Sequence, residues 1–241
     1  MLNISIPDSR RFNFIVGRIV LNERKKIPLL ISEAFQKNCT VIFITCPIPS
    51  WSIAQELERA GALLMETMVH YRHSLKGEDY EFPTQVELAT RNDAKNLQKI
   101  ATSAFSKFQN HYTSDDSLDK RLVEGIYPDL ILRALNDKSV ADAVFVVRNS
   151  LLDPIGFSSL KMDKSGKVFA VLYAVEPSSE RKGVFRNLLQ ASIFWAKKNG
   201  GKYFEYTTQV ANLKVNKSLT EVGFSPQSHS LIFHLWLNNQ V

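Results

Sequence analysis

The segment from Val168 to Asn199 constrains the fold of this chain more than any other part of the sequence. Residues 168–175 predict a strand, a polar turn follows, and residues 183–199 have the apolar spacing of a helix that begins at Gly183. The first N–H groups of a helix lack partners within the helix and carry the positive end of its dipole. We therefore expect a turn that binds a phosphate or pyrophosphate group, although an ordinary helix start with exposed basic residues is the alternative. The basic residues of the turn are Arg181, Lys182 and Arg186.

The second half of the sequence, residues 84–241, alternates strands and helices in an order that predicts a mixed sheet. Three consecutive strands are followed by a helix, a strand, a helix and a last strand, which indicates a mostly antiparallel sheet with a crossover helix. The expected fold class is therefore α/β (α+β), with helices flanking the sheet. The expected strands are 84–88, 143–147, 154–160, 168–175, 203–208 and 231–236, and the expected helices are 92–105, 117–136, 183–199 and 214–221.

The first half predicts a smaller α/β domain on the substrate side of the protein. Residues 40–45 form a continuous β-branched run, which is typical of a strand buried on both faces. The polar stretch 75–81 ends near a proline and predicts a linker. We therefore expect two domains, residues 1–80 and residues 84–241. Further strands are expected at 14–21 and 63–73, and helices at 28–36 and 53–60.

Composition excludes several classes of protein. The chain is 44% hydrophobic, no segment reaches the roughly 18 uncharged apolar residues of a membrane span, and the start lacks the layout of a signal peptide. The net charge of +6 comes from scattered Lys and Arg residues without a basic tail, which fits an enzyme with phosphate-bearing substrates as well as a nucleic-acid partner. We expect a cytoplasmic enzyme without nucleic-acid partner or membrane insertion, whose two cysteines stay reduced.

The turn resembles the acetyl-CoA loop of the GNAT superfamily of N-acetyltransferases. The family pattern is Arg or Gln, two residues, Gly, one residue, then Gly or Ala; Gly183 matches its first glycine, whereas Glu180 and Phe185 depart from it. Asn212 follows the next strand, and Gly223-Phe224 precedes the last strand, as in the family.

The resemblance implies a GNAT fold with acetyl-CoA as acyl donor and no metal. In that family the strand before the turn pairs with the pantetheine amides, the turn holds the pyrophosphate, and the asparagine holds the pantetheine arm or the local turn. The implied donor-binding residues are Leu172, Tyr173, Ala174, Val175, Arg181, Lys182, Gly183, Val184, Phe185, Arg186 and Asn212.

Over the whole chain, the sequence also resembles the dTDP-sugar N-acetyltransferases, typified by dTDP-4-amino-4,6-dideoxygalactose (dTDP-fucosamine) acetyltransferase. The similar segments are Phe14–Ile19, Thr207–Asn212 and the loop after Ala104. This resemblance implies an amino sugar nucleotide as acceptor and a place in cell-surface polysaccharide biosynthesis. The expected acceptor-binding residues are Phe105, Phe108, His111 and Tyr112.

The catalytic residues are harder to assign because Leu219 stands where the family usually has a tyrosine that protonates the CoA thiolate. Tyr173 and Tyr206 are candidate substitutes, with simple packing as the alternative. Glu205 lies between two aromatic residues, either as a buried base of raised pKa or as a solvated edge residue.

The histidines divide by position. His111 is expected either to bind a substrate phosphate or to have no role, while His229 and His234 are expected to be structural. His70 and His73 are expected to face solvent.

We expect an enzyme that transfers acetyl, or another short acyl group, from CoA to the amine of a nucleotide-linked amino sugar. Attack would be direct in a ternary complex, because no nucleophilic side chain is evident. The alternatives are a GNAT enzyme for a peptide, lysine or polyamine, and an acyl-CoA-binding module with weak or no turnover. The expected partners are small molecules, and the sequence does not decide whether the protein forms a homodimer.

Overall fold

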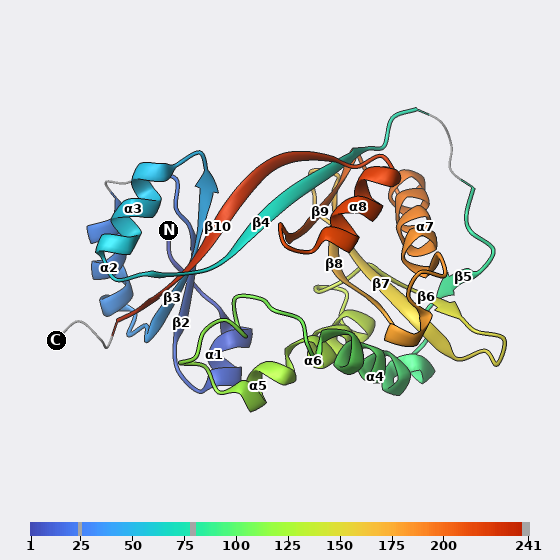
Figure 1. Cartoon of the computed structure of the whole chain (residues 1–241), viewed down its shortest axis with the longest axis horizontal. Helices are drawn as coiled ribbons and strands as arrows, with labels where there is room; N and C mark the ends of the chain where they lie inside the picture. Colours follow the sequence, from blue (N-terminus) through green and yellow to red (C-terminus); the bar gives the residue numbers. More distant parts are fainter. Residues whose placement is uncertain (24–25, 78–80, 238–241) are drawn as a thin grey trace.

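A ten-stranded sheet forms the centre of the computed structural model, which describes residues 1–23, 26–77 and 81–237. The strands lie in the order β1-β2-β3-β10-β4-β9-β8-β7-β6-β5, so one sheet extends through both halves of the chain (Figure 1). The mixed, mostly antiparallel pairing with flanking helices confirms the predicted fold class.

The second half contributes one end of this sheet. Strands β5, β6, β7 and β8 are antiparallel neighbours, and β9 lies parallel to β8 after the crossover helix α7. Helices α4 and α6 pack on one face of this part, and α7 and α8 pack on the other. The elements are β5 (Val86–Leu88), α4 (Ala94–Phe105), α5 (Lys120–Glu124), α6 (Ile126–Asn136), β6 (Ala143–Arg148), β7 (Pro154–Met162), β8 (Lys167–Val175), α7 (Val184–Lys198), β9 (Tyr203–Gln209), α8 (Leu213–Glu221) and β10 (Ser225–Trp236).

The first half contributes the other end, but it is completed by the last strand of the chain. Strand β10 lies antiparallel between β3 and β4, so each half of the protein depends on a strand from the other. The division into residues 1–80 and 84–241 stays a prediction, and part of the expected linker, residues 78–80, lies outside the described residues. The elements are β1 (Asn3–Ile4), α1 (Ile6–Phe12), β2 (Val16–Val20), α2 (Ile27–Gln36), β3 (Val41–Ile48), α3 (Trp51–Arg59) and β4 (Leu63–Ser74), of which β1 and α1 were not predicted.

The loop from α4 to α5 joins the two halves on one face of the sheet. Leu118 and Val123 from the second half are buried with Phe12 and Val16 from the first. A hydrogen-bonded ion pair between Arg11 and Asp129 ties α1 to α6. This loop therefore lies over β3 and β10, where it becomes part of the site.

The two parallel strand pairs of the sheet differ in a way that decides where a ligand enters. Strands β2 and β3 stay paired from Val16 opposite Val41 to Val20 opposite Thr45. Strands β8 and β9 pair only from residues 167–169 opposite residues 203–205, and beyond these they diverge. The divergence leaves a cleft between β8 and β9 that has no counterpart between β2 and β3.

Candidate active site

The turn between β8 and α7 has the backbone geometry of an anion site. Arg181 and Gly183 both adopt left-handed conformations, with φ of 62° and 78°. Residues of alternating hand turn successive N–H groups toward one side, which makes a concave site for anions. Gly183 is the N-cap of α7 and no side chain caps this 15-residue helix, so its first N–H groups are available to a ligand.

Cations surround this turn and one carboxylate is neutralised. Arg181 and Arg186 line the cavity that begins at the turn, together with Lys214 from α8. Glu180, at the position where Arg or Gln is usual, accepts a hydrogen bond of 2.7 Å from Lys214 Nζ. Lys182 is exposed and is not among the residues that line this cavity. The turn therefore keeps a positive balance despite Glu180.

The cleft beyond the turn exposes one backbone edge of β8. Residues 172–175 bond to β7 on one side, and their pairing with β9 has already ended at Phe169. Their remaining N–H and C=O groups can therefore pair with the amides of an extended ligand, as an added strand would. Leu172, Tyr173, Ala174 and Val175 all line the cavity, so the structure brings the predicted strand and turn residues together.

Asn212 lies at the mouth of the cleft and holds the local turn. Its Oδ1 accepts from the N–H of Val215 at 3.5 Å, and its Nδ2 lies 3.3 Å from Thr208 Oγ1. Asn212 is therefore the N-cap of α8. It also lines the cavity, within reach of a ligand in the cleft.

A single cavity of about 1550 Å³ runs from the turn, through the cleft, to the face of the first half of the sheet. Phe105 and Phe108 form one wall with Tyr127, whose ring stacks on Phe105 with centroids 4.0 Å apart. The far end is lined by Arg18 and His111. Both halves of the chain therefore build the site.

Tyr112 supports this far end rather than lining it. Its hydroxyl donates to Asp8 Oδ1 at 3.0 Å and is hydrogen-bonded to Arg18, which also bonds to Asp8 at 2.7 Å. Burial raises the pKa of Tyr112, so the phenol stays protonated. Arg18 itself lines the cavity and is held in place by these two partners.

His111 is the outer member of a buried hydrogen-bonded chain. Its Nδ1 lies 2.9 Å from His234 Nε2, and His234 Nδ1 lies 2.6 Å from Asp115 Oδ2, which also accepts from Trp236 Nε1 at 2.9 Å. Burial, then the nearby His234, holds the pKa of His111 well below its usual value. Asp115 and His234 thus fix the tautomer and orientation of a neutral imidazole at the cavity wall, and His234 has the structural role expected of it.

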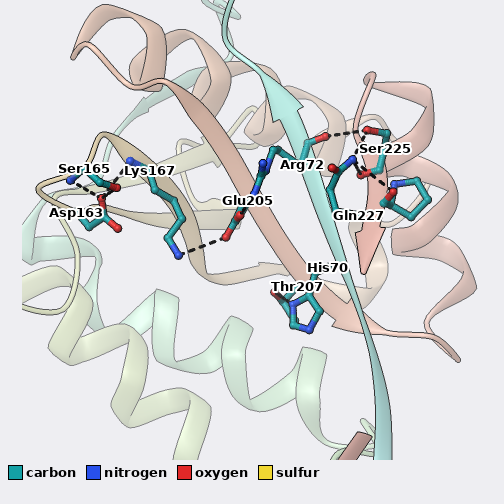
Figure 2. A network of polar contacts seen from close by, with 10 residues as sticks. His70, Arg72, Asp163, Ser165, Lys167, Glu205, Thr207, Ser225 and Gln227 are labelled. Atoms are coloured by element: carbon teal, nitrogen blue, oxygen red, sulfur yellow. Dashed lines mark hydrogen bonds and ion pairs between the residues drawn. The ribbon is translucent and has the colours of Figure 1, made fainter. Parts of the chain in front are cut away.

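The three predicted catalytic side chains have different surroundings. The Tyr173 hydroxyl donates to Ser192 Oγ at 2.6 Å, whereas no hydrogen bond joins the Tyr206 hydroxyl to the described part of the chain. Burial raises the pKa of both phenols. Glu205 accepts from Arg72 at 2.8 Å and lies 3.4 Å from Lys167 (Figure 2).

Leu219 has no access to the cleft. Its side chain is fully buried in the core between α8 and the sheet, next to Phe204 and Phe224. A leucine there packs and cannot donate a proton.

Two expectations about histidines were wrong. His73 is only 5% exposed, and its ring packs 5.0 Å from that of Phe224. His70 is half-buried, with Nδ1 3.0 Å from Thr207 Oγ1 and Nε2 2.9 Å from Ser230 Oγ. The signal that could have found His70 is strand alternation, because every second residue of β4 from Glu66 faces the cavity side.

The fold and this site are those of an acyl-CoA-dependent N-acetyltransferase, with an anion-binding turn at the start of a crossover helix and a cleft between two diverging parallel strands. The chain belongs to the acetyltransferase (GNAT) family, whose family profile matches residues 98–224. That family uses acetyl-CoA as its acyl donor. No curated protein matches the sequence.

Solved structures similar to this one share its fold at low sequence identity. A GCN5-related N-acetyltransferase from Sphaerobacter thermophilus aligns with a TM-score of 0.61 and 11% identity over 98% of this chain and 76% of its own. A GCN5-related N-acetyltransferase from Kribbella flavida aligns with a TM-score of 0.60 and 11% identity, over 91% of this chain and 80% of its own. A tandem GNAT protein from the clavulanic acid biosynthesis pathway aligns with a TM-score of 0.58 and 13% identity, over 92% of this chain and 75% of its own.

In the part of the chain that the structure describes, no helix is long and apolar enough to cross a membrane. Within the same residues, no group of three or more His, Cys, Asp or Glu side chains is placed to hold a metal ion.

Proposed function

We propose that this protein transfers the acetyl group of acetyl-CoA to the primary amine of a nucleotide-linked amino sugar. The observation that carries the proposal is the continuous cavity, which begins at an anion-binding turn and ends at a second cationic group, Arg18, in the other half of the chain. Such a cavity accommodates two phosphate-bearing molecules end to end.

The donor occupies the turn and the cleft. The pyrophosphate lies on the N–H groups of residues 183–186, with Arg181 and Arg186 supplying charge. The pantetheine extends along the open edge of residues 172–175, and a backbone N–H near Val175 polarises the thioester carbonyl. Phe185 packs beside Tyr173, 5.9 Å between ring centroids, at the point where the arm enters.

The acceptor occupies the part of the cavity built by both halves. The Phe105 and Phe108 wall offers flat apolar surface for a sugar or base. Arg18 suits an acceptor phosphate, and it remains 43% exposed despite its bond to Asp8. His111 offers a hydrogen bond to the same group. A polyamine, which carries several positive charges, would be repelled by Arg18, and Glu66 is the carboxylate that lines this part of the cavity.

The transfer is direct. The amine nitrogen attacks the thioester carbon, a C–N bond forms, and the C–S bond breaks as CoA leaves. Tyr206 donates the proton to the thiolate, because this residue lines the cavity and its hydroxyl has no hydrogen-bond partner among the described residues, whereas that of Tyr173 is bound to Ser192. Tyr173 holds the floor of the cleft in place. Glu205 supports the site by its ion pairs with Arg72 and Lys167.

The experiment is an acceptor screen with purified protein and acetyl-CoA, following release of free thiol. The panel contains dTDP-4-amino-4,6-dideoxygalactose, other amino sugar nucleotides, spermidine and a lysine-containing peptide. We expect turnover with an amino sugar nucleotide. Faster turnover of spermidine or of the peptide would overturn the acceptor assignment and leave the acetyltransferase assignment in place.

A second candidate, an acyl-CoA-binding module that has lost turnover, is favoured by Leu219, which leaves the usual proton-donor position without a donor. The same screen separates the two functions. Tight binding of acetyl-CoA without thiol release in any arm supports the module.

A further inference from the structure

The acceptor must lose a proton during transfer, and the side chains predicted from the sequence leave this step without a base. Glu205 is ion-paired, and both Tyr173 and Tyr206 hold their protons more tightly than usual because they are buried. A side chain that takes a proton from an amine needs a lone pair facing the acceptor part of the cavity.

His70 of strand β4 lies where such a base is needed. Strand β4 is the direct neighbour of β9, and His70 is paired in register with Thr207. Thr207 comes two residues after Glu205, where β8 and β9 have just diverged. His70 and Thr207 both line the main cavity, and Figure 2 shows them side by side on the two strands.

Two hydroxyl groups hold the imidazole of His70 from opposite sides. Thr207 Oγ1 lies 3.0 Å from Nδ1, and Ser230 Oγ from strand β10 lies 2.9 Å from Nε2. Thr207 is exposed to the cavity and Ser230 is buried. If Nε2–H donates to Ser230, then Nδ1 accepts from the Thr207 hydroxyl, whose oxygen lone pairs face the cavity.

A second cavity of about 270 Å³ begins on the other side of His70. Both cavities are lined by His70 and Ser230, and the smaller one also by Arg72, Glu205 and His229. The imidazole therefore stands between the acceptor part of the main cavity and a second opening, with one hydroxyl on each side.

We propose that His70 is the general base for the acceptor amine, with Thr207 relaying the proton. This proposal rests on the acetyltransferase function proposed above. As the amine nitrogen bonds to the thioester carbon, its proton passes to Thr207 Oγ1 and the Thr207 proton passes to His70 Nδ1. The imidazolium then releases its Nε2 proton through Ser230 into the second cavity, and return of the Nδ1 proton to Thr207 with uptake of a proton at Nε2 restores the starting tautomer. The CoA thiolate takes a separate proton from Tyr206, which regains one from solvent, so charge and protons balance.

The surroundings of His70 suit this role. Burial lowers the pKa of His70. The Glu205 carboxylate raises this pKa, and His229 lowers it further. Two other charged groups lie near His70: Arg72, which is paired with Glu205, and Glu66, which lines the same cavity from the same face of β4. The ring is therefore uncharged at neutral pH and ready to accept a proton, since a base must be unprotonated at the start of the step.

The test compares an amine, which is largely protonated at neutral pH, with hydroxylamine, which is largely uncharged there and whose adduct loses its N–H proton to water more readily, so that hydroxylamine depends less on a protein base. The amine is the compound that turns over best in the acceptor screen. Wild type, His70→Gln and the control Leu151→Gln, which changes an exposed residue between β6 and β7 that lines neither cavity, are assayed with acetyl-CoA and each nucleophile. Thermal melting and calorimetric titration of acetyl-CoA verify folding and donor binding.

We expect His70→Gln to lower kcat with the amine about 100- to 1000-fold, the range for loss of a general base. Its rate with hydroxylamine stays within about threefold, the acetyl-CoA affinity is unchanged, and the part of the acidic limb that His70 contributes to the pH profile disappears, leaving the part that protonation of the amine contributes. Equal loss with both nucleophiles would overturn the proposal, because His70 would then only shape the site.

Thr207 provides an independent check. Thr207→Val keeps the shape but removes the relay hydroxyl and should lower the amine rate, whereas Thr207→Ser should restore most of it. A Val variant as active as the Ser variant would overturn the relay. A wild-type protein that binds acetyl-CoA but acetylates neither nucleophile would instead overturn the acetyltransferase function, and the role of His70 with it.

Discussion

A methyl group placed on Gly156 would come within 2.6 Å of Val184 Cγ1, so strand β7 and the first residue of helix α7 are in close contact through this glycine. The contact fixes the height of the helix start above the sheet. The N–H groups that we propose to bind the donor pyrophosphate belong to this same turn, which links a packing detail to the proposed donor site.

Gly156→Ala should therefore weaken both folding and donor binding. We expect a loss of about 1–3 kcal/mol of stability, as for other overpacked sites, and a several-fold rise in the acetyl-CoA dissociation constant. Chemical denaturation and calorimetry measure the two effects. Gly125→Ala is the control, because the one tight contact of its added methyl is with the flexible end of the Arg11 side chain, 2.9 Å away, and its next contacts are at 3.8 Å. Unchanged acetyl-CoA affinity in Gly156→Ala would contradict the link.

Gly183→Glu should abolish measurable acetyl-CoA binding, because a carboxylate at the turn repels the pyrophosphate. Gly200→Glu is a closely matched control at the other end of α7: both glycines have φ of 78° and open space around a new side chain. Both variants should lose about 1–2 kcal/mol from left-handed strain. If calorimetry finds equal acetyl-CoA affinity in the two, the donor site lies elsewhere.

Tyr206→Phe should lower kcat by up to about 100-fold without changing acetyl-CoA affinity, because it removes the proton donor to the thiolate. Tyr173→Phe should mainly reduce stability, by about 0.5–1.5 kcal/mol, through loss of the bond to Ser192. Steady-state kinetics and thermal melts of both variants distinguish the roles. The opposite pattern would exchange the two tyrosines.

Stability should fall as the pH is lowered from 7 toward 5. The pKa of His111 is held well below 6.5 by burial and by His234, so below 6.5 the unfolded chain binds a proton that the folded chain does not. Each such group costs up to about 1.4 kcal/mol per pH unit in this window. His111→Gln should flatten this dependence, and its acceptor KM should rise while acetyl-CoA affinity stays unchanged.

Tyr112→Phe tests the support of Arg18 in the same assay. The variant keeps the ring packing but loses the hydroxyl that bonds to Asp8 and Arg18. Its acceptor KM should rise less than that of His111→Gln. An unchanged acceptor KM in both variants, with only a lower melting temperature, would make this loop structural.

Local patterns were sufficient to predict most of the elements around the donor turn. The run 168–175 and the helix from Gly183 follow from periodicity and a glycine, and both lie close to β8 and α7. The left-handed conformation of Arg181 was not predictable, since nothing in an arginine favours it.

The acceptor side depends on contacts between distant residues, and sequence periodicity carries no information about them. His70 meets Thr207 and Ser230, which lie 137 and 160 positions away along the chain. His73 reads as a polar residue in a strand, yet the core around Phe224 buries it. Pairing of strands across the two halves decides both cases.

The position of β10 has a consequence for how the chain is synthesised. Strands β3 and β4 are not hydrogen-bonded to each other, because residues 225–236 lie between them. While the ribosome is still making the middle of the chain, both strands present unpaired edges, which are templates for wrong association. The pairing of β3 and β4 within the sheet therefore cannot be completed before residues 225–236 have been synthesised.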